Sequence, residues 1–218
     1  MLISLPKLLI SNSDIMLEEI TFTFEINIRR VRELLGLYQS IGGYSGRRAN
    51  HKLDILRASV VFLHSTLEDY LRSVMAWKLP ESSQAEINKI PIPEKHKGEK
   101  FQLGDLIIYK GKTVDELISR SIIEYLNSKS FNNKVELVES LRSINIQLPD
   151  NFRSKYLETI DEMMKRRHNI VHQADRDKTI PGNPLKYKSL NVKTVIKWIK
   201  CIDKLVLTIN KQLRQSVE

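Results

Sequence analysis

The stretch Asp54-Ile-Leu-Arg-Ala-Ser-Val-Val-Phe-Leu-His-Ser-Thr-Leu-Glu-Asp-Tyr-Leu-Arg-Ser-Val-Met75 decides the fold. Its apolar residues recur at helical spacing and cover much of the circumference of a helix: Ile55, Val60, Phe62, Leu63, Leu67, Leu71, Val74 and Met75. A helix that is apolar over most of its surface is buried among other elements. We therefore predict a long central helix over about residues 47–79, ended by Pro80.

Most of the chain on either side of this helix also follows the helical period. Further helices are predicted over about residues 14–39, 113–129, 133–141, 151–174 and 191–214. Polar residues suited to N-capping open four of them: Asp14, Thr113, Asp150 and Asn191. No segment alternates at the strand period over more than a few residues. The predicted fold class is therefore all-α.

Length and composition indicate one globular domain, residues 1–218. We expect an N-terminal arm and helix over residues 1–46, in which the apolar start is a packed arm and not a signal peptide. A helical core over 47–214 follows, with an irregular insertion at about 80–112 that holds one short helix near 102–109. No apolar run is long enough to span a membrane. The single cysteine, Cys201, excludes a disulfide framework and fits a cytoplasmic location.

The charge of the chain indicates what it binds. Lys and Arg number 35 against 26 Asp and Glu, which gives a net charge of +9 and a pI near 9.5. Such an excess attracts polyanions, nucleic acid before an anionic membrane. The charge alone fits equally well a protein that is basic but binds no polyanion.

The densest chemistry lies in Lys165-Arg-Arg-His-Asn-Ile-Val-His-Gln-Ala-Asp175, where two of the five histidines follow three consecutive cations. Because successive helical residues turn by about 100°, His168 and His172 share one face. Arg167 and His172 splay by about 140° on a straight helix. They would meet on one ligand from the rim of a groove, or across a symmetric dimer.

An arginine and a histidine suit the cleavage of RNA. RNA carries its own nucleophile, the 2′-hydroxyl, so the protein has to move protons and stabilise negative charge on the phosphate. Imidazole gives and takes protons near neutral pH, and guanidinium grips phosphate oxygens while staying charged. This chemistry requires neither a metal nor a cofactor.

The segment Arg167-His-Asn-Ile-Val-His172 resembles the signature of the HEPN superfamily of α-helical RNases: an Arg, a polar residue, three more residues and a His. The tail Ile170-Val-His-Gln-Ala-Asp175 is similar to the RiboL-PSP-HEPN branch, found in toxin and phage-defence contexts. The central helix adds Glu68 and Arg72, which resemble the acidic and basic residues that face the signature in this family. The resemblance covers roughly residues 50–210 and leaves the first 45 outside.

This resemblance implies a four- or five-helix core that dimerises, with the two signatures forming one cleft. It implies a metal-independent endoribonuclease that leaves a 2′,3′-cyclic phosphate, with a role as a toxin or antiphage defence effector. The partners would be RNA, a second copy and an antitoxin or defence-system protein. The implied catalytic residues are Arg167 and His172, supported by His168, Glu68, Asn169 and Arg72, with Lys165 and Arg166 as RNA contacts.

One position departs from the family pattern. A subgroup of HEPN toxins carries a Tyr two residues after the signature His, and a nucleotidyltransferase partner modifies it. Here that position is Ala174, so we do not expect this regulation.

Two other functions fit the same residues. The domain would bind RNA or a protein without catalysis if the histidines were only polar residues at a helix end. Alternatively, His168, His172 and Asp175 would supply three metal ligands on one helical face. The sequence His-Asn-Ile-Val-His lacks the Glu of a zincin, so we expect no metal.

Overall fold

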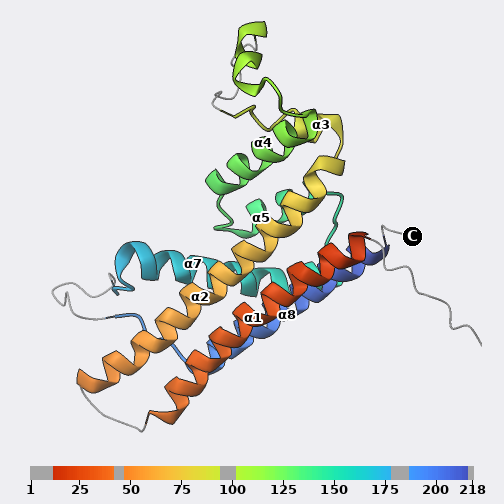
Figure 1. The fold of residues 1–218 in the computed structure, drawn as a ribbon. Coiled ribbons are helices and arrows are strands. Elements are labelled where there is room, and N and C mark those ends of the chain that lie inside the picture. The colour runs from red at the N-terminus through yellow and green to blue at the C-terminus, as the bar shows by residue number, and fades with distance from the viewer. Residues whose placement is uncertain (1–11, 42–46, 94–101, 178–186, 216–218) are drawn as a thin grey trace, which may run out of the picture.

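The computed structural model describes residues 12–41, 47–93, 102–177 and 187–215, and within these ranges it is all-α (Figure 1). This confirms the predicted fold class. A lone antiparallel bridge, between Arg176 and Tyr187, is the only β pairing in the described ranges. The α-helices are α1 (Asn12–Ser40), α2 (Arg47–Lys78), α3 (Gln84–Ile87), α4 (Val114–Ser128), α5 (Lys134–Ser143), α6 (Asp150–Phe152), α7 (Glu158–Gln173) and α8 (Val192–Gln215).

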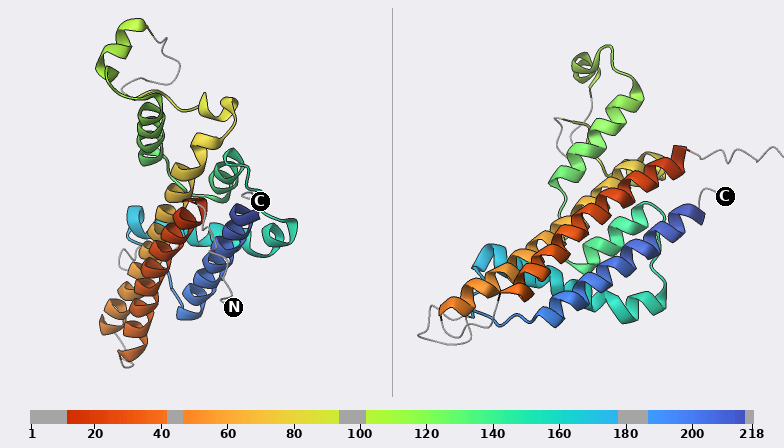
Figure 2. Two further views of the ribbon diagram at one scale, coloured as in Figure 1. Left: turned by 45° about the vertical axis from the view of Figure 1, so that its right-hand side comes forward. Right: turned by 60° about the horizontal axis from the view of Figure 1, so that its bottom comes forward.

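The long helix α2 lies at the centre of the molecule. It packs against α1, α4, α7 and α8, and α1, α2 and α8 run side by side as the three longest helices (Figures 1 and 2). Leu63, Leu67 and Leu71 are completely buried there. Phe62 was predicted to be buried with the other apolar residues of this helix, but it is 42% exposed. The guanidinium of Arg30 on α1 lies 5.4 Å from its ring centroid, so a cation–π contact partly covers a ring that does not enter the core.

The predicted N-caps form at α4 and α8, and Asn133 caps α5 as well. Thr113 Oγ1 accepts a hydrogen bond from the Glu116 amide, and the Glu116 carboxylate accepts one from the Thr113 amide. The side chains of Asn133 and Asn191 accept backbone hydrogen bonds at the starts of α5 and α8. The prediction was wrong at Asp150, because α6 begins at that residue and Pro149 holds the N-cap position. It was also wrong at Asp14, because α1 begins at Asn12 and Asp14 lies within the first turn. A carboxylate there still stabilises the positive end of the helix dipole.

Residues 79–93 and 102–128 form an outer lobe that projects from the three long helices (Figures 1 and 2). The lobe contains a 3₁₀ turn, η1 (Leu79–Glu81), then α3, a longer 3₁₀ segment, η2 (Leu103–Tyr109), and α4. The segment η2 is the short helix predicted near 102–109. Residues 129–133 lead from the lobe back to α5 and, as shown below, contact the candidate site.

The helix predicted over 151–174 consists of three consecutive pieces. It begins with α6, widens into one π-helical segment, η3 (Arg153–Leu157), and continues as α7. Three parts of the chain lie outside the described residues: the predicted arm at residues 1–10, the Gly-rich segment 42–46 and most of the loop after Asp175. None of the described helices combines the length and the apolarity required to cross a membrane.

Candidate active site

Arg167 points from α7 towards α2. Its Nη2 lies 3.7 Å from Glu68 Oε2, and its Nη1 donates a hydrogen bond of 3.2 Å to Asn132 Oδ1, in the segment between α4 and α5. The side chain is 20% exposed, and its buried Nε has no hydrogen-bond partner within the described part of the chain. The guanidinium is therefore held on two sides while part of it remains accessible.

The carboxylate of Glu68 is shared by several neighbours on the buried side of this site. Oε2 also lies 3.4 Å from His64 Nδ1, and Oε1 lies 3.8 Å from Arg72 Nη2. Burial acts to raise the pKa of Glu68, but contact with His64 and the charges of Arg72 and Arg167 outweigh it, so the pKa lies below its usual value. Glu68 is therefore an anion at neutral pH. Its side chain is largely buried, whereas the carboxylate of a surface ion pair is exposed to water.

Arg72 connects Glu68 to the outer lobe. Its Nε and Nη2 donate hydrogen bonds to the carbonyl oxygens of Leu126 and Lys129, 3.1 and 2.8 Å away. These carbonyls lie at the C-terminal end of α4, where a cation interacts favourably with the negative end of the helix dipole. Arg72 thus fixes the end of α4 close to the segment that carries Asn132.

His168 and His172 lie next to one another on the exposed side of α7. Their ring centroids are 4.6 Å apart, with the planes tilted by 43°, as the four-residue spacing predicts. An exposed imidazole is able to exchange protons with a substrate or with water. One copy of the chain therefore presents two imidazoles on the outer face of α7 and the Arg167 guanidinium on the face towards α2.

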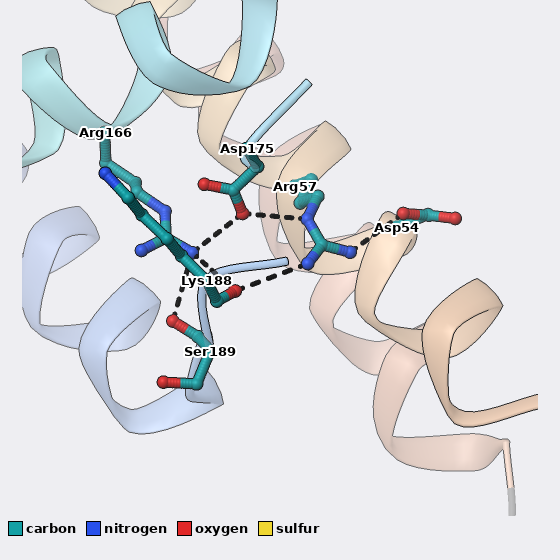
Figure 3. A network of polar contacts seen from close by, with 6 residues as sticks. All are labelled: Asp54, Arg57, Arg166, Asp175, Lys188 and Ser189. Atoms are coloured by element: carbon teal, nitrogen blue, oxygen red, sulfur yellow. Dashed lines mark hydrogen bonds and ion pairs between the residues drawn. The ribbon is translucent and has the colours of Figure 1, made fainter. Parts of the chain in front are cut away.

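A buried carboxylate, Asp175, anchors the C-terminal end of α7 (Figure 3). Its Oδ2 accepts hydrogen bonds from Arg57 Nε on α2 and from Arg166 Nη2, at 2.9 and 2.8 Å, and the residue is completely buried. Arg166 also donates to the carbonyl oxygens of Lys188 and Ser189. This cluster, which we call the Asp175 clamp, joins α7, α2 and the segment before α8.

A left-handed turn brings Asp175 into this position. Ala174 and Asp175 have φ angles of 49° and 55°, and the Asp175 amide donates to the carbonyl of Asn169 at 3.0 Å. Such a turn usually carries Gly, and Ala174 offers no such signal in the sequence. The partner Arg57 is 118 residues away, so sequence reasoning found neither the turn nor the clamp.

The structure separates the residues of the metal-binding alternative. Asp175 turns inwards to the two arginines, whereas the histidines remain exposed. Among the described residues, no three His, Cys, Asp or Glu side chains lie close enough together to hold a metal ion.

The expected RNA contacts have different surroundings. The Nζ of Lys165 lies 2.6 Å from Asp161 Oδ2, and the lysine side chain is 70% exposed. Arg166 is only 16% exposed and is bonded within the Asp175 clamp. The side chain of Asn169 is partly buried. Contact of these three residues with RNA or substrate stays a prediction.

Comparison with known families identifies the family of this chain. The RiboL-PSP-HEPN family model matches residues 25–215, and the chain belongs to this family. HEPN proteins are typically RNases. The match starts inside α1, so the limit of about residue 50 expected for the resemblance was too narrow. No curated protein and no solved structure matches the chain.

Proposed function

We propose that this protein is a metal-independent endoribonuclease that cleaves RNA with Arg167 and His172 in a cleft shared by two copies of the chain. Family membership supports an RNA substrate. The observation that carries the proposal is the placement of Arg167: an anionic Glu68 and Asn132 hold its guanidinium, on the helix whose outer face presents His168 and His172.

The chemistry follows from the residue types. One imidazole takes the proton of the 2′-hydroxyl, and the 2′-oxygen then attacks the phosphorus. The bond from phosphorus to the 5′-oxygen breaks, and a second, protonated imidazole gives its proton to that oxygen. The products are a 2′,3′-cyclic phosphate and a 5′-hydroxyl. Arg167 stabilises the negative charge that builds up on the phosphate oxygens.

The arrangement within one chain favours a shared cleft. The directions of Arg167 and His172 around α7 differ by about 140°. This angle supports a cleft to which each of two copies supplies one of the two groups. A twofold axis beside α7 would bring the histidines of one copy to the arginine of the other. Closed twofold dimers are the commonest soluble assemblies.

The biological role that we propose is that of a toxin or antiphage defence effector. The support is the RiboL-PSP-HEPN assignment. Such an enzyme needs a device that restrains it, and we propose an antitoxin or another defence-system protein as its partner.

Cleavage of a mixed RNA by single variants tests the proposal. Arg167→Ala and His172→Ala are each expected to abolish cleavage while the protein stays folded, and EDTA should leave the wild type active. Exposed residues of the same types provide controls: Arg214→Ala on α8 and His51→Ala on α2 should cleave normally. Full cleavage by Arg167→Ala or His172→Ala would refute the catalytic assignment.

One observation favours a second function, an RNA-binding or protein-binding domain without catalysis. The angle of about 140° between Arg167 and His172 around α7 supports it, because a catalytic pair would then depend on a second copy of the chain. This function predicts that the wild type binds RNA with an affinity that falls steeply with salt and leaves it intact after long incubation.

A further inference from the structure

A third histidine, His64, lies behind Arg167 and has no part in the proposed chemistry. It lies on α2, one turn before Glu68, and is completely buried. Its Nε2 is 3.0 Å from the carbonyl oxygen of Phe131, in the segment between α4 and α5. A carbonyl only accepts hydrogen bonds, so Nε2 carries a proton and donates it. His64 therefore ties α2 to residue 131 of that segment.

The residue next to Phe131 is the one that receives Arg167. Asn132 Oδ1 accepts the hydrogen bond from Arg167 Nη1 at 3.2 Å. The position of Oδ1 depends on the backbone at 131–132, because the Asn side chain is short. The bond from His64 fixes that backbone from the buried side.

The other edge of the ring lies against the second partner of Arg167. His64 Nδ1 lies 3.4 Å from Glu68 Oε2, the same oxygen that faces Arg167 Nη2 at 3.7 Å. Nδ1 is buried and has no hydrogen-bond partner within the described residues. One ring is thus in contact with Glu68 and with the carbonyl oxygen of Phe131, the residue next to Asn132.

We infer that His64 is a positioning residue for Arg167, acting through the Phe131 carbonyl and the neighbouring Asn132. This inference rests on the proposed nuclease function, because Arg167 has to meet a phosphate for its position to matter. His64 itself does not touch substrate. It limits the movement of the guanidinium, and small displacements of a catalytic group lower the rate strongly.

Three substitutions separate the two edges of the ring. In His64→Gln the amide nitrogen lies at about the distance of Nε2 from the backbone and keeps the donor for Phe131. In His64→Asn the shorter amide reaches only the position of Nδ1. His64→Phe keeps a ring of similar volume and removes both nitrogens, so it serves as the control for packing.

The expected order of activity is specific. His64→Gln should keep kcat within about threefold of the wild type, whereas His64→Asn and His64→Phe should lower kcat about tenfold, the effect of losing one buried hydrogen bond. KM should change less than twofold in all three. Wild-type kcat in His64→Phe, or equal losses in His64→Gln and His64→Asn, would overturn the inference.

A double-mutant cycle tests the route through Asn132. If His64 acts through Asn132, the double variant His64→Phe with Asn132→Ala should have the kcat of Asn132→Ala alone. A purely structural role would instead make the two losses multiply, and that result would also overturn the inference.

Failure of the proposed function is recognised separately, because the wild type would then cleave no RNA. In that case a crystal structure of His64→Phe still decides the inference. The Asn132 Oδ1 to Arg167 Nη1 distance should exceed the hydrogen-bond range in the variant. An unchanged distance would refute the positioning role.

Discussion

Arg167 and Glu68 form an ion pair whose closest atoms are 3.7 Å apart, longer than the roughly 2.8 Å of a charge-assisted hydrogen bond. The carboxylate also contacts two other groups, His64 and Arg72. The charge of Glu68 therefore orients the Arg167 guanidinium without occupying its hydrogen-bond donors. In the proposed nuclease those donors would be available to a phosphate.

Mixing two inactive variants should restore cleavage if the cleft is shared. In a mixed dimer of Arg167→Ala and His172→Ala, the first chain supplies His172 and the second supplies Arg167. We expect mixed samples to regain a substantial part of the wild-type rate after subunit exchange, measured on a fluorescent RNA. Each variant alone is the control. No recovery, with exchange demonstrated, would mean that the pair acts within one chain.

Replacing Glu68 by Gln should slow cleavage about tenfold, because a neutral amide no longer orients the guanidinium. We also expect a loss of about 1 to 2 kcal/mol in the free energy of unfolding at pH 7. Denaturant titration and kcat measurements check both effects. Unchanged kcat in Glu68→Gln would show that the carboxylate does not orient Arg167.

The stability difference between wild type and Glu68→Gln should depend on pH in one direction. The pKa of Glu68 in the folded protein lies below its usual value of 4.5, so the carboxylate stabilises the fold above that pH. This stabilisation is lost as the pH falls through the lowered pKa. The difference should therefore be constant from pH 8 to about 5 and shrink below pH 4.5. A difference that grows on acidification would contradict this sign.

Substitutions at the Asp175 clamp should mainly change stability. Asp175→Asn removes a completely buried charge that both Arg57 and Arg166 contact, which should cost about 3 kcal/mol in unfolding free energy. Asp54 also pairs with Arg57 but is 63% exposed, so Asp54→Asn should cost less than about 1 kcal/mol. Equal losses in the two variants would show that the buried carboxylate is not the anchor of α7.

Lys165 and Arg166 should respond differently to alanine. Lys165→Ala should weaken RNA binding and should reduce the slope of log K against log salt concentration by about one. The fold should stay intact, because the lysine side chain is exposed. Arg166→Ala should lower the free energy of unfolding, because its guanidinium belongs to the Asp175 clamp. Salt titrations of binding, made in the His172→Ala background, and denaturant titrations separate the two. The opposite pattern would assign Arg166 to RNA.

The rate of cleavage should pass through a maximum between pH 5 and 9. One imidazole has to be neutral to take a proton and another charged to give one, so the active fraction falls on both sides. Measuring kcat/KM across this range on one oligonucleotide checks the expectation. A flat profile would exclude acid and base catalysis by histidine.

The sequence alone determined the helical class and most helix boundaries, and it was sufficient to identify the residues of the signature. Capping at Thr113 and the shared face of His168 and His172 depend on residues within one turn of each other, so local spacing is sufficient. The likeness of Glu68 and Arg72 to the family pattern predicted that they lie near the signature. The spacing of residues in the sequence did not predict which groups these two side chains contact.

Only the tertiary structure decided what surrounds Arg167 and how α7 is anchored. Asn132 is 35 residues from Arg167, and Arg57 is 118 residues from Asp175, so no local pattern records either contact. The left-handed turn at Ala174 is likewise set by packing and not by a glycine. These contacts form because helices distant in sequence bury their apolar faces together, and the charged side chains on those faces must then find partners inside the fold.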